Sequence, residues 1–153
     1  MPAQKLKQFL DENGVRYVRI IHSPAYTSQE IAANAHVPGK ELAKTVMVRL
    51  DGKMAMAVVP ATTQVDLDKL RKATGASSAE VATEADFRDA FPECEAGAMP
   101  PFGNLYDMQV LVDKALKEDE TIAFNAGAHS ELVKMEFADY KRLVKPKLAD
   151  IAD

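Results

Sequence analysis

A hairpin over residues 44–59 constrains the fold of this chain more than any other stretch. Residues 44–50 and 53–59 are β-prone runs, and the dipeptide Asp-Gly joins them at 51–52. Both turn residues tolerate the positive φ of a type I′ turn, so this pattern is a strong hairpin signal. The two-residue loop fixes the register and predicts that Lys44 faces Val59 at the far end of the ladder.

Alternation along the hairpin places Lys44 on an otherwise apolar face. The residues that share this face are Val46, Val48, Leu50, Ala55, Ala57 and Val59, whereas Met47, Met54 and Met56 fill the core on the opposite face. A lysine at a strand end commonly lays its stem on apolar surface and keeps its ammonium in water. The other interpretation is a cation at the mouth of an apolar pocket, facing an anionic or polarised ligand group.

The composition is that of an ordinary globular protein. The 153 residues fit one domain, with 47% hydrophobic and 27% charged residues. We expect a cytoplasmic protein, because Cys94 is the single cysteine, no apolar run has membrane-spanning length and the N-terminus lacks a signal-peptide core. A formal charge of −4 argues against broad, nonspecific nucleic-acid binding but permits a local basic patch.

Helix and strand patterns mix irregularly along the chain, which favours an α+β domain with a largely antiparallel, curved sheet. We expect helices over residues 3–13, from Thr27 to about His36, from Asp66 to Gly75, from Thr83 to Phe91, and over 137–144. Further strands are expected over residues 15–21, 78–81, 109–112, 121–125 and 132–135.

Two glycine-bearing loops are candidates for chemistry. Residues 97–103 carry a glycine at each end and two prolines, so the loop is stiff and can approach a ligand closely. Its N–H groups could stabilise a developing oxyanion, although a stiff surface turn is an equally good interpretation. In the loop 125–130, His129 could orient a substrate or a water, or could be an ordinary turn residue.

The cysteine and histidine pattern predicts neither a thiol nucleophile nor a metal site. Cys94 lies between Glu93 and Glu95, whose charges disfavour a thiolate. The three histidines are scattered and give no zinc spacing. We therefore expect no metal and no cofactor.

Four short motifs in this order resemble one known family. They are His22-Ser23-Pro24, Ala43-Lys44-Thr45-Val46-Met47-Val48, Gly97-x-x-x-Pro101-Phe102-Gly103 and Phe124-Asn125-Ala126-Gly127-x-His129. Together they resemble the YbaK/ProX family, which comprises the editing domain of bacterial prolyl-tRNA synthetases and its free-standing relatives. The resemblance runs from about Val15 to Ile151 and implies a single domain, spanning residues 1–153, with a mixed barrel-like sheet flanked by helices.

The resemblance also implies site residues. Lys44 would be the family's essential lysine, contacting the acceptor-end phosphate or the ester carbonyl, and Gly97 would offer its N–H to the oxyanion. Residues expected at the substrate pocket or its rim are Tyr26, Thr27, Thr45, Pro101, Phe102, Gly127 and His129. Met99-Pro100 and His129 differ from the residues usual in the family, so no particular amino acid is implied.

The activity implied is hydrolysis of the ester in a mischarged aminoacyl-tRNA that carries a small amino acid, without metal or covalent intermediate. Its partner would be the acceptor end of tRNA, with transient contact to an aminoacyl-tRNA synthetase and none to a membrane. Lysines and arginines in the N-terminal region and in residues 134–147 suggest a shallow phosphate track. The alternatives are a tRNA-end binding module without activity, or a hydrolase of another small ester.

Overall fold

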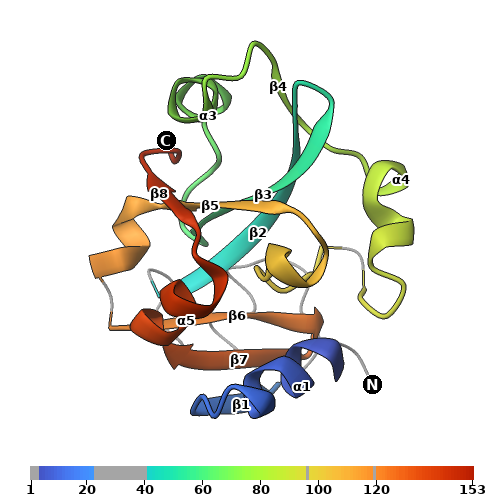
Figure 1. The fold of residues 1–153 in the computed structure, drawn as a ribbon, viewed down its shortest axis with the longest axis vertical. Helices are drawn as coiled ribbons and strands as arrows, with labels where there is room; N and C mark the ends of the chain where they lie inside the picture. Colours follow the sequence, from blue (N-terminus) through green and yellow to red (C-terminus); the bar gives the residue numbers. More distant parts are fainter. Residues whose placement is uncertain (1–3, 23–40, 96, 119) are drawn as a thin grey trace.

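In the part of the chain that the structure describes, the framework is one mixed sheet of eight strands (Figure 1). The computed structural model describes residues 4–22, 41–95, 97–118 and 120–153. The strands are β1 Tyr17–Ile21, β2 Leu42–Leu50, β3 Lys53–Pro60, β4 Ala79–Val81, β5 Gln109–Asp113, β6 Thr121–Ala128, β7 Glu131–Glu136 and β8 Lys147–Ala149. The helices are α1 Gln4–Glu12, α3 Leu67–Thr74, α4 Glu84–Phe87 and α5 Phe137–Val144, with 3₁₀ turns η1 Arg88–Ala90, η2 Gly103–Leu105 and η3 Lys114–Glu118.

The hairpin forms in the predicted register. Lys44 pairs with Val59, as the two-residue turn requires. Asp51 and Gly52 have φ values of 51° and 82°, which are the positive angles of a type I′ turn. The Asp51 carboxylate also accepts the backbone N–H of Ser78 at 2.9 Å, which ties the turn to the chain entering β4.

The strand order is β1-β7-β6-β2-β3-β5-β8, with β4 added to β2. Among the described residues, the β2–β6, β3–β5 and β5–β8 pairs are parallel, and the other four pairs are antiparallel. The mixed sheet flanked by helices is confirmed. It is barrel-like only loosely, because the path begins at β1 and ends at β8 without closing.

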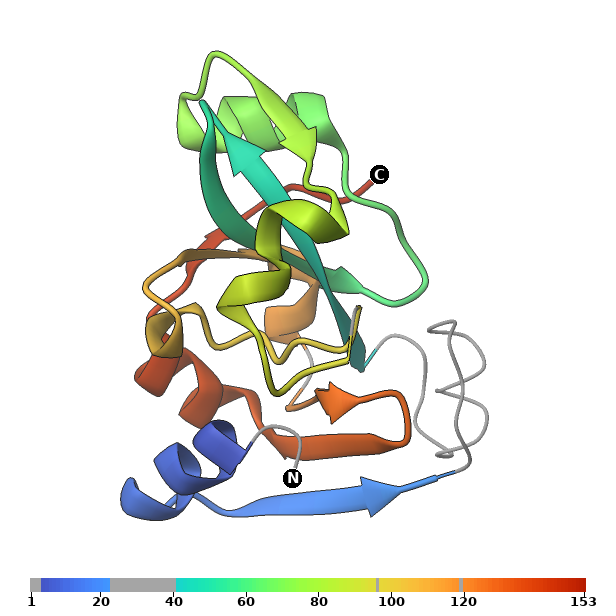
Figure 2. The same ribbon diagram turned by 90° about the vertical axis from the view of Figure 1, so that its right-hand side faces the viewer.

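Helices pack on both faces of the hairpin. Buried side chains of α1 and α5 join the methionine face of the hairpin in the largest core cluster. α3 packs against the opposite face through Leu70, beside Val48, Val59 and the C-terminal Ile151. Figure 2 shows α4 and the chain that follows it crossing in front of β2 and β3. Lys44 therefore belongs to the α3 side of the hairpin, and the methionines belong to the other side.

Most expected elements are present, with two differences in the described ranges. The helix expected from Thr83 to Phe91 is only α4, a single turn followed by the 3₁₀ turn η1, because the backbone leaves α-helical angles at Phe87, with φ −122° and ψ −8°. β8 was not expected, because its three residues follow a helix and carry no alternating pattern. The helix expected from Thr27 falls outside the described residues. Within the described ranges, no helix is long and apolar enough to cross a membrane.

Candidate active site

The two glycine loops are joined directly to each other. The N–H of Glu95 donates to the carbonyl oxygen of Gly127, and the N–H of Gly127 donates to the carbonyl oxygen of Ala98, both at 2.8 Å. The β6–β7 ladder is irregular between Asn125 and Ala128, and Gly127 has a φ of 93°, which only glycine adopts readily. This bulge turns the Gly127 peptide out of the ladder, so the two loops form one unit.

Gly97 lies beneath the imidazole of His129. Its φ is 81°, and a Cβ built on it would lie 3.6 Å from Cε1 of His129. The loop is braced by Glu95, whose Oε1 accepts the backbone N–H of His129 at 3.2 Å. No backbone hydrogen bond between described residues uses the N–H of Gly97 or of Met99. These two N–H groups stay candidates for the donors that would stabilise an oxyanion.

Pro101 and Phe102 anchor this loop from the core side. The hydroxyl of Tyr140 donates to the carbonyl oxygen of Pro101 at 2.7 Å. Phe102 is fully buried, and its ring centroid lies 5.3 Å from those of Phe124 and Tyr140. Packing of this kind holds the backbone of a loop in one conformation. The structure thus gives both residues a supporting position, and their role in shaping a pocket stays a prediction.

Lys44 stands on β2 between two apolar clusters. On its face of the sheet, Leu42 precedes it in a cluster with Ala61, and Val46 follows it at the edge of the α3 cluster. Lys44 is partly buried, and within the described ranges it makes no hydrogen bond or ion pair. Thr45 points to the opposite face, as its place beside Lys44 on the strand requires.

Two opposing effects act on the charge of Lys44. Burial lowers the pKa of its ammonium from the ordinary value, and the negative charge of Asp153 raises that pKa in part. Asp153 is held in place by Gln64: its N–H donates to the Gln64 carbonyl at 3.0 Å, and its Oδ1 accepts the Gln64 N–H at 2.9 Å. A desolvated cation without an ion-pair partner interacts strongly with any anionic group that reaches it.

β6 connects the lysine to the loops. Ala43, next to Lys44, pairs with Phe124 of β6, and the Phe124 ring packs on Phe102 of the glycine loop. No hydrogen bond or ion pair among the described residues joins Lys44 to residues 97–103. The structure thus joins Gly97, Pro101, Phe102, Gly127 and His129 closely and places Lys44 and Thr45 on the adjoining strand. Tyr26 and Thr27 lie outside the described residues.

A sequence model of the aminoacyl-tRNA editing domain matches residues 22–143, which is most of the chain. The chain belongs to this family. The family resemblance stated on the four motifs is therefore confirmed.

Several relatives align with the editing-domain chain over most of its length. The multifunctional Ser/Thr-tRNA deacylase ProXp-y of Escherichia coli K12 is 27% identical over 152 residues, covering 96% of this chain and 90% of the relative. The prolyl-tRNA editing protein ProX of Acetoanaerobium sticklandii is 28% identical, covering 89% of this chain and 86% of the relative. Proline–tRNA ligase of Bacillus mycoides is 24% identical over 88 residues, which is 15% of that enzyme.

Solved structures share the fold of this editing domain at low sequence identity. A hypothetical protein superposes with a TM-score of 0.88 at 18% identity, covering 98% of this chain and all of the other. A proposed trans-editing enzyme for prolyl tRNA synthetase superposes with a TM-score of 0.83, also at 18% identity, covering 99% of this chain and 96% of the other. These likenesses support the fold alone.

The titratable groups of the editing domain bear on two kinds of catalysis, by a metal ion and by a cysteine thiolate. Among the described residues, no group of three His, Cys, Asp or Glu side chains could hold a metal ion. Burial raises the pKa of Cys94 to about 11, and the charge of Glu93 adds to this, against an opposing hydrogen bond with Tyr106. At neutral pH the thiol is therefore protonated and is a poor nucleophile.

A cavity of about 200 Å³ lies on the α4 side of the glycine loop. It is lined by Glu84, Phe87, Arg88, Phe91, Pro92, Cys94 and Met99. Met99 is almost fully buried and belongs to the loop 97–103, so it is the lining residue through which the cavity borders that loop. The cavity is large enough for a few water molecules or a small side chain.

Sequence reasoning missed three residues beside the site. The sequence around Glu95 indicates only an effect of its charge on Cys94, whereas in the structure the Glu95 carboxylate accepts the backbone N–H of His129. The charge of Asp153 acts on Lys44 from the far end of the chain, and sequence separation hides such an electrostatic interaction. Asn125 belongs to the fourth family motif, which gives it no role. Only the structure shows that the oxygen of its side chain is buried without a hydrogen-bond partner among the described residues.

Proposed function

We propose that this protein is a trans-editing hydrolase that cleaves the ester of mischarged aminoacyl-tRNA carrying a small amino acid. The observation that supports this most is the joined pair of glycine loops, next to the strand that carries Lys44. Among the described residues, no backbone carbonyl accepts the N–H of Gly97 or Met99, and Lys44 has no ion-pair partner. Membership of the editing-domain family and relatives named as deacylases point to the same substrate class.

The proposed mechanism needs few catalytic groups. An aminoacyl ester is already activated, so a positioned water and stabilisation of the tetrahedral oxyanion are the main requirements. The N–H of Gly97 would bind the oxyanion, and the Lys44 ammonium would bind the acceptor-end phosphate or the ester carbonyl. The proposed mechanism uses no covalent intermediate, because the Cys94 thiol is protonated. It uses no metal ion, because the N–H of Gly97 and the Lys44 ammonium would stabilise the negative charge of the tetrahedral intermediate.

Size would select the substrate. Pro101 is buried and Met99 nearly so, which leaves the loop backbone little room to move away from a larger side chain. Exclusion by size discriminates between two amino acids by about 1–3 kcal/mol per methylene. That is enough for an editing site that hydrolyses only those synthetase products whose side chains are small enough to enter it. Thr45, Tyr26, Thr27 and His129 are proposed to complete the pocket and its rim.

The tRNA contact is proposed to be limited to the acceptor end. Several cations of the expected phosphate track are already engaged: Lys7 and Arg19 pair with Glu131, and Arg142 pairs with Asp139. Few phosphates would then be neutralised, and affinity should fall only gently as salt increases. A transient complex with a synthetase would supply the substrate.

A panel of mischarged tRNAs tests the proposal. Purified protein is mixed with seryl-, threonyl- and alanyl-tRNAs of cognate and non-cognate sequence, together with bulkier aminoacyl-tRNAs, and ester loss is followed over time. Hydrolysis of at least one mischarged tRNA with a small amino acid, with bulkier substrates spared, is the expected result. Tight binding of the panel without hydrolysis would instead show a tRNA-end binding module.

A further inference from the structure

Asn125 lies where β2 and β6 separate. The two parallel strands pair at Leu42–Ala123 and at Ala43–Phe124, and the pairing ends there. Alternation then places Lys44 and Asn125 as the next side chains on the face of Leu42 and Ala123. The two residues are thus the first side chains beyond the last rung of this ladder, on the same side of the sheet.

The side-chain oxygen of Asn125 is buried without a hydrogen-bond donor. Its Oδ1 is inaccessible and accepts no hydrogen bond within the described part of the chain. Two neighbours on this face are apolar: Ala123 and Leu132, the β7 residue paired with Asn125, are both fully buried in one cluster. A buried carbonyl left without a donor costs about 1–3 kcal/mol, so a ligand that supplies a donor here would recover that cost.

We propose that the Asn125 carboxamide binds the α-ammonium group of the aminoacyl ester and so orients the ester carbonyl toward Lys44 and the Gly97 loop. This inference rests on the proposed function. The α-ammonium is a donor that every aminoacyl ester carries, whatever its side chain. A hydrogen bond from this group to Oδ1 would supply the missing donor and fix the substrate's orientation.

An uncharged acceptor suits this position better than a carboxylate. A carboxylate beside Lys44 would pair with the lysine ammonium and withdraw that cation from the substrate. A carboxamide oxygen binds an ammonium without neutralising its neighbour. The arrangement also predicts a selectivity beyond side-chain size: esters whose amino group is acylated, such as peptidyl- or formyl-aminoacyl esters, present no ammonium and should bind poorly.

Two non-hydrolysable analogues separate this role from catalysis. One is 3′-deoxyadenosine bearing an alanyl, seryl or threonyl group through a 3′-amide. The other is its counterpart with hydrogen in place of the α-ammonium. Calorimetry should show that the native protein binds the ammonium analogue about tenfold tighter or more, the effect of one charge-assisted hydrogen bond. Asn125→Leu should abolish that preference and leave binding of the counterpart unchanged.

Two further variants keep the test specific. Thr121→Val removes a polar group from the same face of β6 and should leave the preference intact. Asn125→Asp retains the acceptor and nearly the same volume, so it should preserve the preference for the ammonium, yet slow ester hydrolysis by pairing with Lys44. That split between binding and turnover is not expected of a residue that only supports the fold.

The proposal is overturned if the native protein binds both analogues equally or binds neither at millimolar concentration, or if Asn125→Leu keeps the preference. A ribose hydroxyl as the true donor would show itself as an equal loss for both analogues in Asn125→Leu, which also overturns it. Deacylation of the tRNA panel is scored separately. The proposed ammonium site can therefore be disproved while the deacylase function is confirmed, and the deacylase function can be disproved while the ammonium site is confirmed.

Discussion

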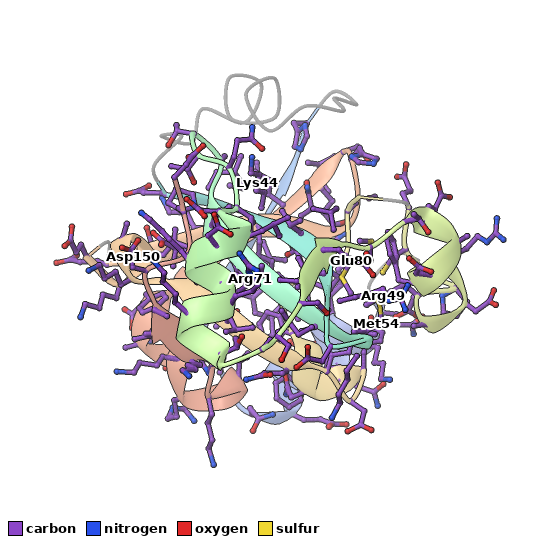
Figure 3. All side chains as sticks on the ribbon, turned by 90° about the horizontal axis from the view of Figure 1, so that it is seen from above. Lys44, Arg49, Met54, Arg71, Glu80 and Asp150 are labelled. Carbon is purple, nitrogen blue, oxygen red and sulfur yellow. The ribbon has the colours of Figure 1, made fainter. Side chains whose placement is uncertain are left out.

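Strand β2 carries two cations whose surroundings differ in kind. Arg49 lies near the turn, with Nη1 3.6 Å from Oε1 of Glu80 and 3.8 Å from Oδ1 of Asp86. Lys44 lies at the other end of the strand (Figure 3). Among the described residues it has no ion-pair partner. Arg49 is neutralised by the protein itself and needs no ligand. Lys44 is partly desolvated, and within the described ranges the charge of Asp153 acts on it without forming an ion pair. This is the state expected of a cation that binds an anionic or polarised substrate.

The largest effect is expected at Lys44. Lys44→Ala should lower the rate of deacylation about a hundredfold or more, because it removes an electrostatic stabiliser of the transition state. Thermal unfolding should change little, since the side chain makes no ion pair within the described residues. Arg49→Ala is the matched control: it should keep turnover and lower the free energy of unfolding by at most about 1 kcal/mol. Full activity in Lys44→Ala, or an equal loss in Arg49→Ala, would contradict the contrast between the two cations.

A second contrast separates two glycines that share a left-handed backbone. Gly97 has a φ of 81° in the loop under His129, and Gly75 has a φ of 74° at the end of α3, with open space around it. Alanine costs about 1 kcal/mol at either position, because an L side chain is strained there. Gly97→Ala should also lower kcat more than it weakens binding, whereas Gly75→Ala should lower only stability. If both variants lost stability alone, Gly97 would be a turn residue and not an oxyanion donor.

The position of Lys44 on β2 could be predicted from the sequence, because it depends only on the turn and the strand alternation of one hairpin. An Asp-Gly turn fixes the hairpin register, and the register fixes which face Lys44 occupies. Likewise, Asp66 accepts the N–H groups of Asp68 and Lys69, and Gly75 ends α3, as capping patterns predict. These outcomes depend on residues close together in the chain.

Contacts between distant segments could not be predicted in the same way. The bond between Glu95 and Gly127, the position of Asp153 near Lys44 and the unsatisfied oxygen of Asn125 arise from tertiary packing. β8 pairs in parallel with β5, and parallel pairing leaves no turn signal between neighbouring strands. The glycine loops were each found, but nothing in the sequence indicated that they bond to one another.

A smaller effect is expected from the charge of Asp153. Burial lowers the pKa of Lys44 and Asp153 raises it, so Asp153→Asn should lower that pKa further. Activity that requires protonated Lys44 is lost as pH rises through this pKa, and the alkaline limb should therefore move to lower pH. The measurement is a single-turnover rate profile, corrected for spontaneous ester hydrolysis. Asp150→Asn is the control, because Asp150 pairs with Lys69 at 3.3 Å. An alkaline limb that stays in place, or moves as far in the control, would show that Asp153 does not act on Lys44.

The smallest effect is expected at Cys94, although it lies only a few residues before Gly97. Its thiol pKa of about 11 leaves almost no thiolate at pH 7, so Cys94→Ser should keep the deacylation rate within about twofold. Iodoacetamide should alkylate the native thiol slowly at pH 7 and faster as pH increases, which reports the same pKa without reference to activity. Chelator treatment should likewise leave turnover intact. A loss in Cys94→Ser as large as that in Gly97→Ala would point to a thioester intermediate, and the loop N–H groups would then stabilise the oxyanion of cysteine attack instead of water attack.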